Sequence, residues 1–568
     1  MGRYRANLLP FILTTAVALA LLASCGSSGT GSGSSNPGRG SANGSGASFG
    51  VGSNPNPGFR ASSIDVITYH YDHMRTGQNT SEAILTPANV NSAGFGKLGS
   101  FIVDGKVDAQ PLYLSNVTIP GVGVRNVLYV VTENGTVFAF DADNVNGNTT
   151  QALWTKSTQL QGEVPSDDRT CDQVTPEIGI TSTPVIDRSR GVIYVIAVSK
   201  DASGSYHHRI HALDLTTGNE MLGGPTTITA TFPGSGAGSS GGNVVFDPSQ
   251  YNERAGLLEV NGTIVTAWGS HCDIAPYTSW VIGYSADTLQ QMGVLNLVPN
   301  GKEGGIWMAG GAPASDAAGN VYFIIGNGTF DTTLNSGFPA QGDCGNCFAK
   351  ISVPSLALLD YFTPRNTVML SSDDSDFGSG GPLLLPDLTD ANGTIQHLAV
   401  ASGKENASIY VLSRDNMGKF NSSADNIYEE ISAGIGTSGE FGKPSYFNNT
   451  VYYGGVGDAL KAFPIANAKL ATTPSSQSSI QFPYPGTTPT ISSNGAASGI
   501  VWAIENGATG TGVLHAYDAT NLGAELYNSN RAGKRDQFND NKFVTPMVAN
   551  GCLYVGTPNS VVVSGSLQ

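Results

Sequence analysis

The amino-acid sequence predicts an all-β protein, an eight-bladed β-propeller of four-stranded antiparallel blades that occupies residues 61–568. Three observations support this fold. A strand-and-turn phrase recurs along the chain, a proline recurs in step with it, and no amphipathic helical stretch of useful length interrupts them. Only 13% of the residues are charged while 73 are glycine, a composition typical of secreted, turn-rich β proteins.

The recurring phrase is a short apolar strand followed by a second strand that ends in Asp or a related turn residue. Its clearest copies are VFAFDA at Val137, IHALDL at Ile210 and VLHAYDA at Val513. Looser copies begin at Val281, Ile409 and Leu460. The apolar strands that mark the repeat number eight, and they begin at Leu128, Ile193, Ile264, Val321, His397, Val451, Ile500 and Leu553.

A proline in a small-residue context precedes seven of these strands, at a mean period of roughly 62 residues. The prolines are Pro111, Pro184, Pro313, Pro382, Pro444, Pro489 and Pro546. The third unit lacks the proline, and we expect its counterpart near Gly241-Gly-Asn-Val-Val-Phe. Two stacked sandwiches, the alternative architecture, would not explain one period that runs through the whole chain.

Gly, Asn and Asp turns divide each unit into three or four short strands, the pattern of antiparallel hairpins. A ring of such sheets leaves only short, protected edges. The last unit ends at Val561-Val-Val without an outer strand, and Leu98-Gly-Ser-Phe-Ile-Val is expected to supply it.

The N-terminus has the features of an export signal. Arg3 and Arg5 precede the apolar run Leu8–Leu22, and the following Leu22-Ala-Ser-Cys25 resembles a bacterial lipobox. The resemblance implies that residues 1–24 are a signal peptide and that Cys25 is lipidated. Residues 25–60 then form a flexible Gly/Ser-rich tether. The alternative is a soluble secreted protein with a chance cysteine.

These features place the protein in the bacterial cell envelope, attached to the membrane by its lipid. Gly26 is not the aspartate that retains many lipoproteins at the inner membrane, so the outer membrane or its periplasmic face is expected. The formal net charge of -16 repels phosphate backbones, which argues against nucleic-acid binding.

Five further cysteines lie in the predicted propeller. Two residues separate Cys344 from Cys347, but Phe348 stands where a c-type haem site has histidine, so no haem is expected. A local disulfide is the better interpretation of this pair. A second disulfide between Cys171 and Cys272 is also expected, and Cys552 would then take part in neither disulfide.

One of only five tryptophans, Trp307, lies in the uncharged stretch GGIWMAGGAP. Small neighbours leave the face of an indole open, either to another blade or to a flat ligand. Three further elements follow in order: the strand Val321-Tyr-Phe-Ile-Ile-Gly-Asn327, the acidic Asp373-Asp-Ser-Asp376, and Lys404-Glu-Asn-Ala-Ser-Ile-Tyr-Val-Leu-Ser-Arg414.

These elements, the repeat and the opening segment Tyr71-Asp-His-Met-Arg-Thr-Gly-Gln-Asn together resemble the quinoprotein alcohol dehydrogenase-like propellers over roughly residues 65–565. That superfamily includes enzymes that use pyrroloquinoline quinone (PQQ) and cofactor-free scaffolds such as the lipoprotein of the outer-membrane barrel-assembly machinery. The resemblance is specific for the fold and much less so for chemistry.

The resemblance implies a role for five side chains. Trp307 would be the floor on which the quinone stacks, Lys404 would touch the quinone oxygens, and Asp376 would be the catalytic base. Asn327, Asp376 and, less cleanly, Asp273 would be ligands of Ca²⁺. The sequence departs from the family in lacking a pair of adjacent cysteines and the arginine expected after Asp273.

Two functions therefore follow from the sequence. The first is an oxidoreductase in which PQQ and Ca²⁺ accept hydride from an alcohol or sugar while a carboxylate removes the hydroxyl proton. The second is a cofactor-free scaffold whose central funnel binds a protein, peptide or glycan. In that second case, Trp307 would pack between blades and Asp376 would cap a turn.

Overall fold

A computed structural model describes residues 62–567, apart from residues 146, 405–407, 433, 437 and 508–509. The expected signal peptide, Cys25 and the tether of residues 25–60 lie outside the described residues. Within the described part of the chain, no helix has both the length and the apolar character needed to cross a membrane.

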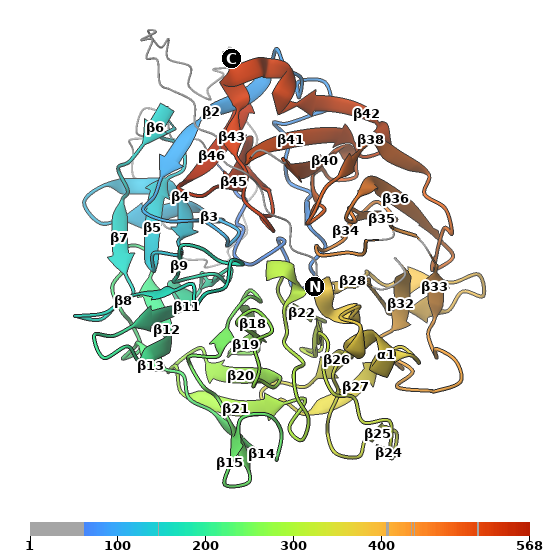
Figure 1. The fold of residues 1–568 in the computed structure, drawn as a ribbon. Helices are drawn as coiled ribbons and strands as arrows, with labels where there is room; N and C mark the ends of the chain where they lie inside the picture. Colours follow the sequence, from blue (N-terminus) through green and yellow to red (C-terminus); the bar gives the residue numbers. More distant parts are fainter. Residues whose placement is uncertain are drawn as a thin grey trace, which may run out of the picture.

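The described chain is almost entirely β, and its sheets are arranged around a common centre, as in a propeller (Figure 1). The helical elements are short: α1 (Thr367–Ser372), η1 (Met308–Gly310), η2 (Phe377–Ser379) and η3 (Ser529–Asp536). The predicted all-β propeller is therefore confirmed, including the lack of long helices.

Eight sheets of four or more strands are present among the described residues. In the first they are β3 (Leu112–Ile119), β4 (Gly123–Val131), β5 (Thr136–Asp141) and β7 (Trp154–Ser157). The second contains β10 (Val185–Asp187), β11 (Val192–Lys200), β12 (Tyr206–Asp214) and β13 (Thr226–Thr227), with β8 (Val164–Asp167) and β9 (Glu177–Ile178) at its edge. The third contains β18 (Leu258–Val260), β19 (Thr263–Ser270), β20 (Trp280–Ser285) and β21 (Gln291–Asn296), with β17 (Tyr251–Asn252).

The next three sheets follow the same antiparallel order. The fourth contains β22 (Ala314–Ser315), β23 (Val321–Ile324), β26 (Phe348–Ile351) and β27 (Leu358–Phe362). The fifth contains β28 (Leu383–Leu384), β31 (Leu398–Ala401), β32 (Ile409–Ser413) and β33 (Glu429–Ile431). The sixth contains β34 (Ser445–Phe447), β35 (Thr450–Tyr453), β36 (Asp458–Ala466), β38 (Ser476–Phe482) and the short β37 (Lys469–Leu470).

The seventh and eighth sheets also recruit strands from the N-terminal part of the chain. The seventh contains β39 (Thr490–Asn494), β40 (Ala497–Asn506), β41 (Thr511–Asp518) and β42 (Asn521–Asn528), with β1 (Gln78–Asn79) and β43 (Phe538–Asn539). The eighth contains β44 (Met547–Ala549), β45 (Cys552–Gly556), β46 (Ser560–Ser566), β2 (Phe95–Ile102) and β6 (Gly147–Thr149). Short additional strands are β14 (Thr231–Pro233), β15 (Ser239–Ser240), β16 (Asn243–Val245), β24 (Leu334–Asn335), β25 (Phe338–Pro339), β29 (Leu388–Thr389) and β30 (Ile395–Gln396).

The N- and C-terminal parts of the described chain close the ring by sharing one sheet. Strand β2 pairs antiparallel with β46, with Phe101 opposite Val561. The sequence segment expected to supply the missing outer strand therefore does so. Pairing the terminal strand removes an exposed sheet edge that would otherwise be open to another chain.

The expected position of the third unit was wrong. The segment near Gly241 forms β16, which pairs with β14 and β15 in a small separate sheet. The inner strand of the third sheet is instead β18, and Leu257 directly before it donates its N–H to Thr183 of the preceding unit. Leu257 replaces the proline at the same position before the inner strand. The repeat prolines alone therefore do not mark the start of every unit.

The hydrophobic core is divided among the interfaces between successive sheets. Eight apolar clusters each join one sheet to the next, beginning with a cluster in which Leu114 and Val127 pack with Ile193 and Leu213. Another joins the eighth sheet to the first, where Phe101 lies 4.8 Å from Phe140 between ring centroids. No sheet can therefore bury its apolar faces without both neighbours.

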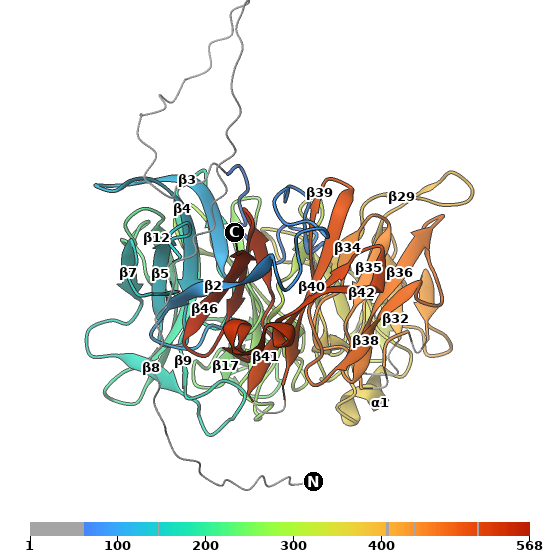
Figure 2. The same cartoon turned by 90° about the horizontal axis from the view of Figure 1, so that it is seen from above.

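The opening segment, residues 66–79, closes one end of the central channel. In the first, second, fourth, fifth, sixth and seventh sheets, N–H groups on the innermost strand face this segment and need acceptors. The segment supplies them: the N–H groups of Tyr113, Ile186, Ser315, Leu384, Tyr446 and Ile491 donate to the carbonyls of Val66, Ile67, His73, Met74, Thr76 and Gly77 at 2.7–3.0 Å. Each donor stands two residues after a repeat proline. Figure 2 shows this dark-blue segment toward the upper face and α1, β8 and β9 toward the lower face.

Candidate functional site

A cavity of about 340 Å³ lies on the central channel, and it collects all five side chains singled out in the sequence. Those five come from the third, fourth and fifth sheets or the loops between them, so no local pattern brings them together. The cavity is lined by Asp172, Gln173, Arg254, Cys272, Asp273, Trp307, Ala309, Asn327, Asp376, Ser379, Lys404, Phe441, Tyr484, Lys542 and Phe543. A volume of this size is in the range of small-molecule sites.

The repeat itself determines which residues face this region. The residue three positions before each repeat proline lines either the main cavity or one of two small cavities beside it. These residues are Asp108, Thr181, Gly310, Ser379, Phe441, Gly486 and Phe543. In the third unit, Arg254 stands three residues before Leu257 and lines the cavity likewise. The chain enters each innermost strand from this end of the channel, so one position per unit faces the axis.

Trp307 lies between a glycine surface and the cavity. A Cβ atom built on Gly269, Gly305 or Gly326 would come within 2.7–2.8 Å of the indole ring, so only glycine permits this contact. The Trp307 side chain is half-buried and lines the cavity, and its remaining surface is available to a ligand. The small residues of the tryptophan stretch therefore let the backbone approach the ring.

Backbone hydrogen bonds hold Trp307 and Asn327 in fixed relation. The N–H of Gly304 donates to the Asn327 carbonyl at 2.7 Å, and the N–H of Gly326 donates to the Gly305 carbonyl at 2.8 Å. Asn327 follows β23, and its half-buried side chain lines the cavity. The indole and the amide are consequently positioned by the same pair of segments.

Asp376 and Lys404 form a buried ion pair at the cavity wall. The Nζ of Lys404 lies 2.8 Å from Oδ1 of Asp376 and 2.6 Å from Oδ1 of Asp374. The Asp376 side chain is 2% exposed, whereas that of Asp374 is 65% exposed. The Lys404 N–H also donates to the Asp376 carbonyl at 2.9 Å, so backbone and side chain both connect the two residues.

The pKa values of this pair shift in the same direction for different reasons. Burial raises the pKa of Asp376, and the Lys404 ammonium opposes that shift only in part. Burial works against the charge of Lys404, but the carboxylates of Asp376 and Asp374 outweigh it and raise the pKa of Lys404. The pair thus holds a strongly protonated ammonium beside a carboxylate of increased basicity.

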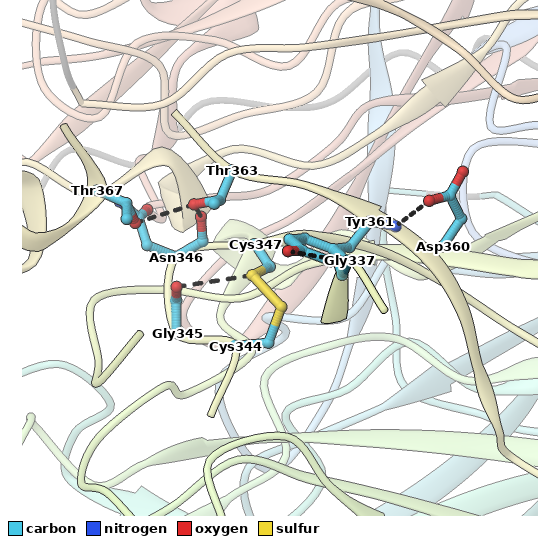
Figure 3. Close-up of a disulfide and its surroundings, with 9 residues drawn as sticks. All are labelled: Gly337, Cys344, Gly345, Asn346, Cys347, Asp360, Tyr361, Thr363 and Thr367. Carbon is cyan, nitrogen blue, oxygen red and sulfur yellow. Dashed lines mark hydrogen bonds between the residues drawn. A yellow bond between two sulfur atoms is a disulfide. The ribbon is translucent and has the colours of Figure 1, made fainter. Parts of the chain in front are cut away.

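The disulfide between Cys344 and Cys347 encloses Asn346, whose backbone carbonyl accepts a hydrogen bond from the Thr363 hydroxyl (Figure 3). It closes a tight loop in which Asn346 has a φ of 60° and donates its N–H to the Gly326 carbonyl at 2.8 Å. The Asn346 side-chain oxygen accepts the N–H of Phe377 at 2.6 Å. The loop therefore ties the residue after Asp376 to the residue before Asn327.

A second disulfide joins Cys171 to Cys272 at the mouth of the cavity, where Cys272 contributes to the lining. The next residue, Asp273, accepts a hydrogen bond from the Tyr277 hydroxyl at 2.7 Å. The residue as a whole is exposed, but its carboxyl faces the cavity, where burial raises its pKa. The Tyr277 hydrogen bond opposes that shift.

The residues proposed as Ca²⁺ ligands thus line one cavity. Among the described residues, however, no three His, Cys, Asp or Glu side chains converge in a ready-made metal site. Asp376 is neutralised by Lys404, Asp273 stands at the rim, and Asn327 supplies only an amide. Ca²⁺ commonly takes six to eight oxygen ligands, so the protein offers a partial set.

Sequence reasoning missed an aromatic wall opposite Trp307. The ring centroids of Phe441 and Tyr484 lie 5.4 Å apart, and those of Tyr484 and Phe543 lie 6.0 Å apart, both edge to face. Lys404 lies 5.9 Å from the Phe441 ring and Lys542 lies 5.5 Å from the Tyr484 ring. The position three residues before the repeat proline would have identified Phe441 and Phe543.

No protein-family model and no curated protein matches the chain. Among solved structures, it is similar to the quinohemoprotein alcohol dehydrogenase from Comamonas testosteroni, with 15% identity over 89% of this chain and 81% of that chain, and a TM-score of 0.55. It is also similar to the quinohemoprotein alcohol dehydrogenase ADHIIG from Pseudomonas putida HK5, with 13% identity over 88% and 80% of the two chains and a TM-score of 0.53. BamB from Moraxella catarrhalis aligns at 11% identity over 83% and 97%, with a TM-score of 0.42. The chain therefore has the β-propeller fold found in the quinohemoprotein alcohol dehydrogenases.

Proposed function

We propose that this protein is a quinone-dependent oxidoreductase acting on CH–OH groups, with PQQ bound in the central cavity. The observation that carries the proposal is that Trp307, Asn327, Asp376 and Lys404, to which the family resemblance assigns roles, line one cavity. The fold alone does not assign chemistry, so the proposal rests on these side chains.

The residues fit a planar quinone. Trp307 is supported from behind by three glycines and turns its remaining surface to the cavity, as a stacking platform requires. The Lys404 ammonium lies at the same cavity and can donate hydrogen bonds to quinone oxygens. When bound, PQQ would supply the hydride acceptor, which no side chain can provide.

The residues also fit Ca²⁺ as a partial ligand set. Asn327, Asp376 and Asp273 would contribute oxygens, and the remaining ligands would come from the quinone and water. Lys404 need not compete for Asp376, because Asp374 lies 2.6 Å from the same ammonium and can retain it.

The protein's own contribution to the reaction is proton removal and orientation. Asp376 is a buried carboxylate whose raised pKa brings its basicity closer to that needed at neutral pH. Lys404 holds that carboxylate in place, at 2.8 Å. The aromatic wall of Phe441, Tyr484 and Phe543 gives the same cavity an apolar surface.

The alternative function is a cofactor-free scaffold that binds a protein, peptide or glycan in the funnel. The aromatic wall supports it, because exposed rings are suitable platforms for sugars and apolar side chains. Tyr484, one of these rings, is 49% exposed and lines the cavity. These side chains would contact a large ligand as readily as a small one.

Calorimetric titration with PQQ, in the presence and absence of Ca²⁺, tests the proposed function. We expect the wild-type protein to bind the quinone with a measurable heat, more tightly with Ca²⁺, and to reduce a dye acceptor when an alcohol or sugar is added. A protein that gives no heat with PQQ at any accessible concentration contradicts the oxidoreductase and leaves the scaffold.

We also propose that the mature protein begins at a lipidated Cys25 and is anchored in the cell envelope. The apolar run before Cys25 and the Gly/Ser-rich tether after it support this location. Cys25→Ser should release the protein from the membrane fraction without lowering its melting temperature, because the tether has no core to disturb. Mass spectrometry of the mature N-terminus checks the result, and uncleaved Met1 or an unmodified Cys25 thiol would contradict it.

A further inference from the structure

Arg254 is a largely buried residue whose guanidinium has no hydrogen-bond or ion-pair acceptor in the described part of the chain, and its charge acts on Asp108 only from beyond ion-pair distance. Its residue is 8% exposed, and it lines both the main cavity and the small cavity beside it. Two other cations line the main cavity: Lys404, which pairs with Asp376, and Lys542. The Arg254 side chain lines the cavity, so its nitrogens have room for an acceptor that a ligand would bring.

The position of Arg254 directs its N–H groups into the cavity. The guanidinium carbon lies 5.2 Å from the ring centroid of Phe543, which comes from the loop before the eighth sheet. Arg254 lies between β17 and β18 of the third sheet, so its side chain reaches across the channel to Phe543. The contact with Phe543 uses no hydrogen-bond donor, so the five N–H donors of the guanidinium are left for an acceptor.

Lys542 adds a second positive charge at the same place. It lines both cavities that Arg254 lines, and no carboxylate of the described chain lies within ion-pair distance of it. The acids on the main cavity have other partners or lie at the rim: Asp376 pairs with Lys404, Asp273 accepts from Tyr277, and Asp172 is exposed. On the small cavity, Asp108 pairs with Lys106 at 3.1 Å and accepts from Asn541 at 2.9 Å. In a protein of formal net charge -16, two unpaired cations side by side are a local exception.

We propose that Arg254 and Lys542 form an anion subsite that binds a carboxylate of the substrate. The substrate class is then hydroxy compounds that carry a carboxylate, such as aromatic or sugar hydroxy acids, and not neutral alcohols. An arginine fork matches a carboxylate with two parallel hydrogen bonds, and the flexible Lys542 adds a point charge. The proposal rests on the proposed function in taking the occupant to be a substrate.

A matched pair of ligands isolates the contribution of the ligand's negative charge to binding. The probes are 4-(hydroxymethyl)benzoate and 4-(hydroxymethyl)benzamide, which have nearly the same shape and differ in charge. Binding to the full chain without quinone is followed by calorimetry. We expect the wild type to prefer the benzoate by roughly 10- to 100-fold, the range for a desolvated charge-assisted contact, and to lose part of that preference in high salt.

Variants assign the preference to the two residues. Arg254→Met should abolish the preference for the benzoate while the benzamide affinity is retained. Arg254→Lys should keep part of the preference, because the positive charge remains but the paired donors of the guanidinium are lost. Lys542→Met should reduce it by a smaller factor. Lys534→Met, which removes an exposed charge on η3, is the matched control and should leave the preference unchanged. Removing an unpaired buried cation should not lower the melting temperature of Arg254→Met.

Several results would overturn the subsite. They are equal wild-type affinity for the two probes, no benzoate binding at millimolar concentration, and equal loss of both ligands in Arg254→Met. A PQQ titration of Arg254→Met separates the sources of the anion: a large loss of quinone affinity would assign the contact to the cofactor and overturn the substrate class. Failure of the wild type to bind PQQ would contradict the proposed function while the probe preference stayed measurable.

Discussion

Trp307→Ala should abolish quinone binding at accessible concentrations while leaving a folded propeller. The ring is half-buried against glycine backbone, so its truncation should reduce the free energy of unfolding by about 1–2 kcal/mol, below the range for a fully buried tryptophan. The same substitution removes the platform on which the ligand stacks. Calorimetric titration with PQQ and thermal unfolding of the same samples measure the two effects.

Trp502→Ala is the matched control, because Trp502 is fully buried and its indole N–H donates to Ser492 at 2.8 Å. That variant should lose about 3–5 kcal/mol of stability and retain its quinone affinity to the extent that it is folded. Gly326→Ala gives a second check: a Cβ there would lie 2.8 Å from Cδ1 of Trp307 and must displace the ring. If Trp307→Ala lost as much stability as Trp502→Ala and kept its quinone affinity, Trp307 would be core and the stacking floor would be wrong.

Asp376→Asn should lower turnover by roughly 100- to 10,000-fold, the usual contribution of a general base, while quinone affinity changes little. The amide keeps the shape of the side chain and loses the proton acceptor. Steady-state kinetics with a dye acceptor measure the loss. Asp374→Asn is the comparison: its side chain is 65% exposed and contacts the same Lys404, so its loss of turnover should be much smaller.

Although Asp376→Asn should lower turnover, it should leave the free energy of unfolding unchanged or increase it. The folded state raises the pKa of Asp376, so the folded protein binds its proton more readily than the unfolded chain does. The charged carboxylate therefore opposes folding at neutral pH, and this penalty is relieved as the pH falls through the folded-state pKa. Asp376→Asn should be neutral or stabilising at pH 7 and should lack that relief on acidification. A marked destabilisation at pH 7 would show that the Lys404 ion pair outweighs the desolvation of Asp376.

Much of the architecture could be predicted because it is periodic. Hydrophobic strands and prolines that recur at one interval require equivalent sheets, and equivalent sheets that each need two neighbours close into a ring. The terminal strand followed from the same reasoning, since a last unit without an outer strand must obtain it from the other end of the chain, as β2 provides for β46. The third unit was misplaced because Leu257 stands where the other units have proline.

The sequence by itself determined the ring of sheets and the order of Trp307, Asn327, Asp376 and Lys404 along it. Only the tertiary structure decided that Arg254 reaches Phe543 across the channel, and that Phe441, Tyr484 and Phe543 form one wall. The physical reason is distance along the chain. One residue of each unit faces the axis, so the site is assembled from positions tens of residues apart, and their contacts exist only after the ring has closed. Whether a charge such as Arg254 has a partner depends on those contacts and has no signature in local sequence.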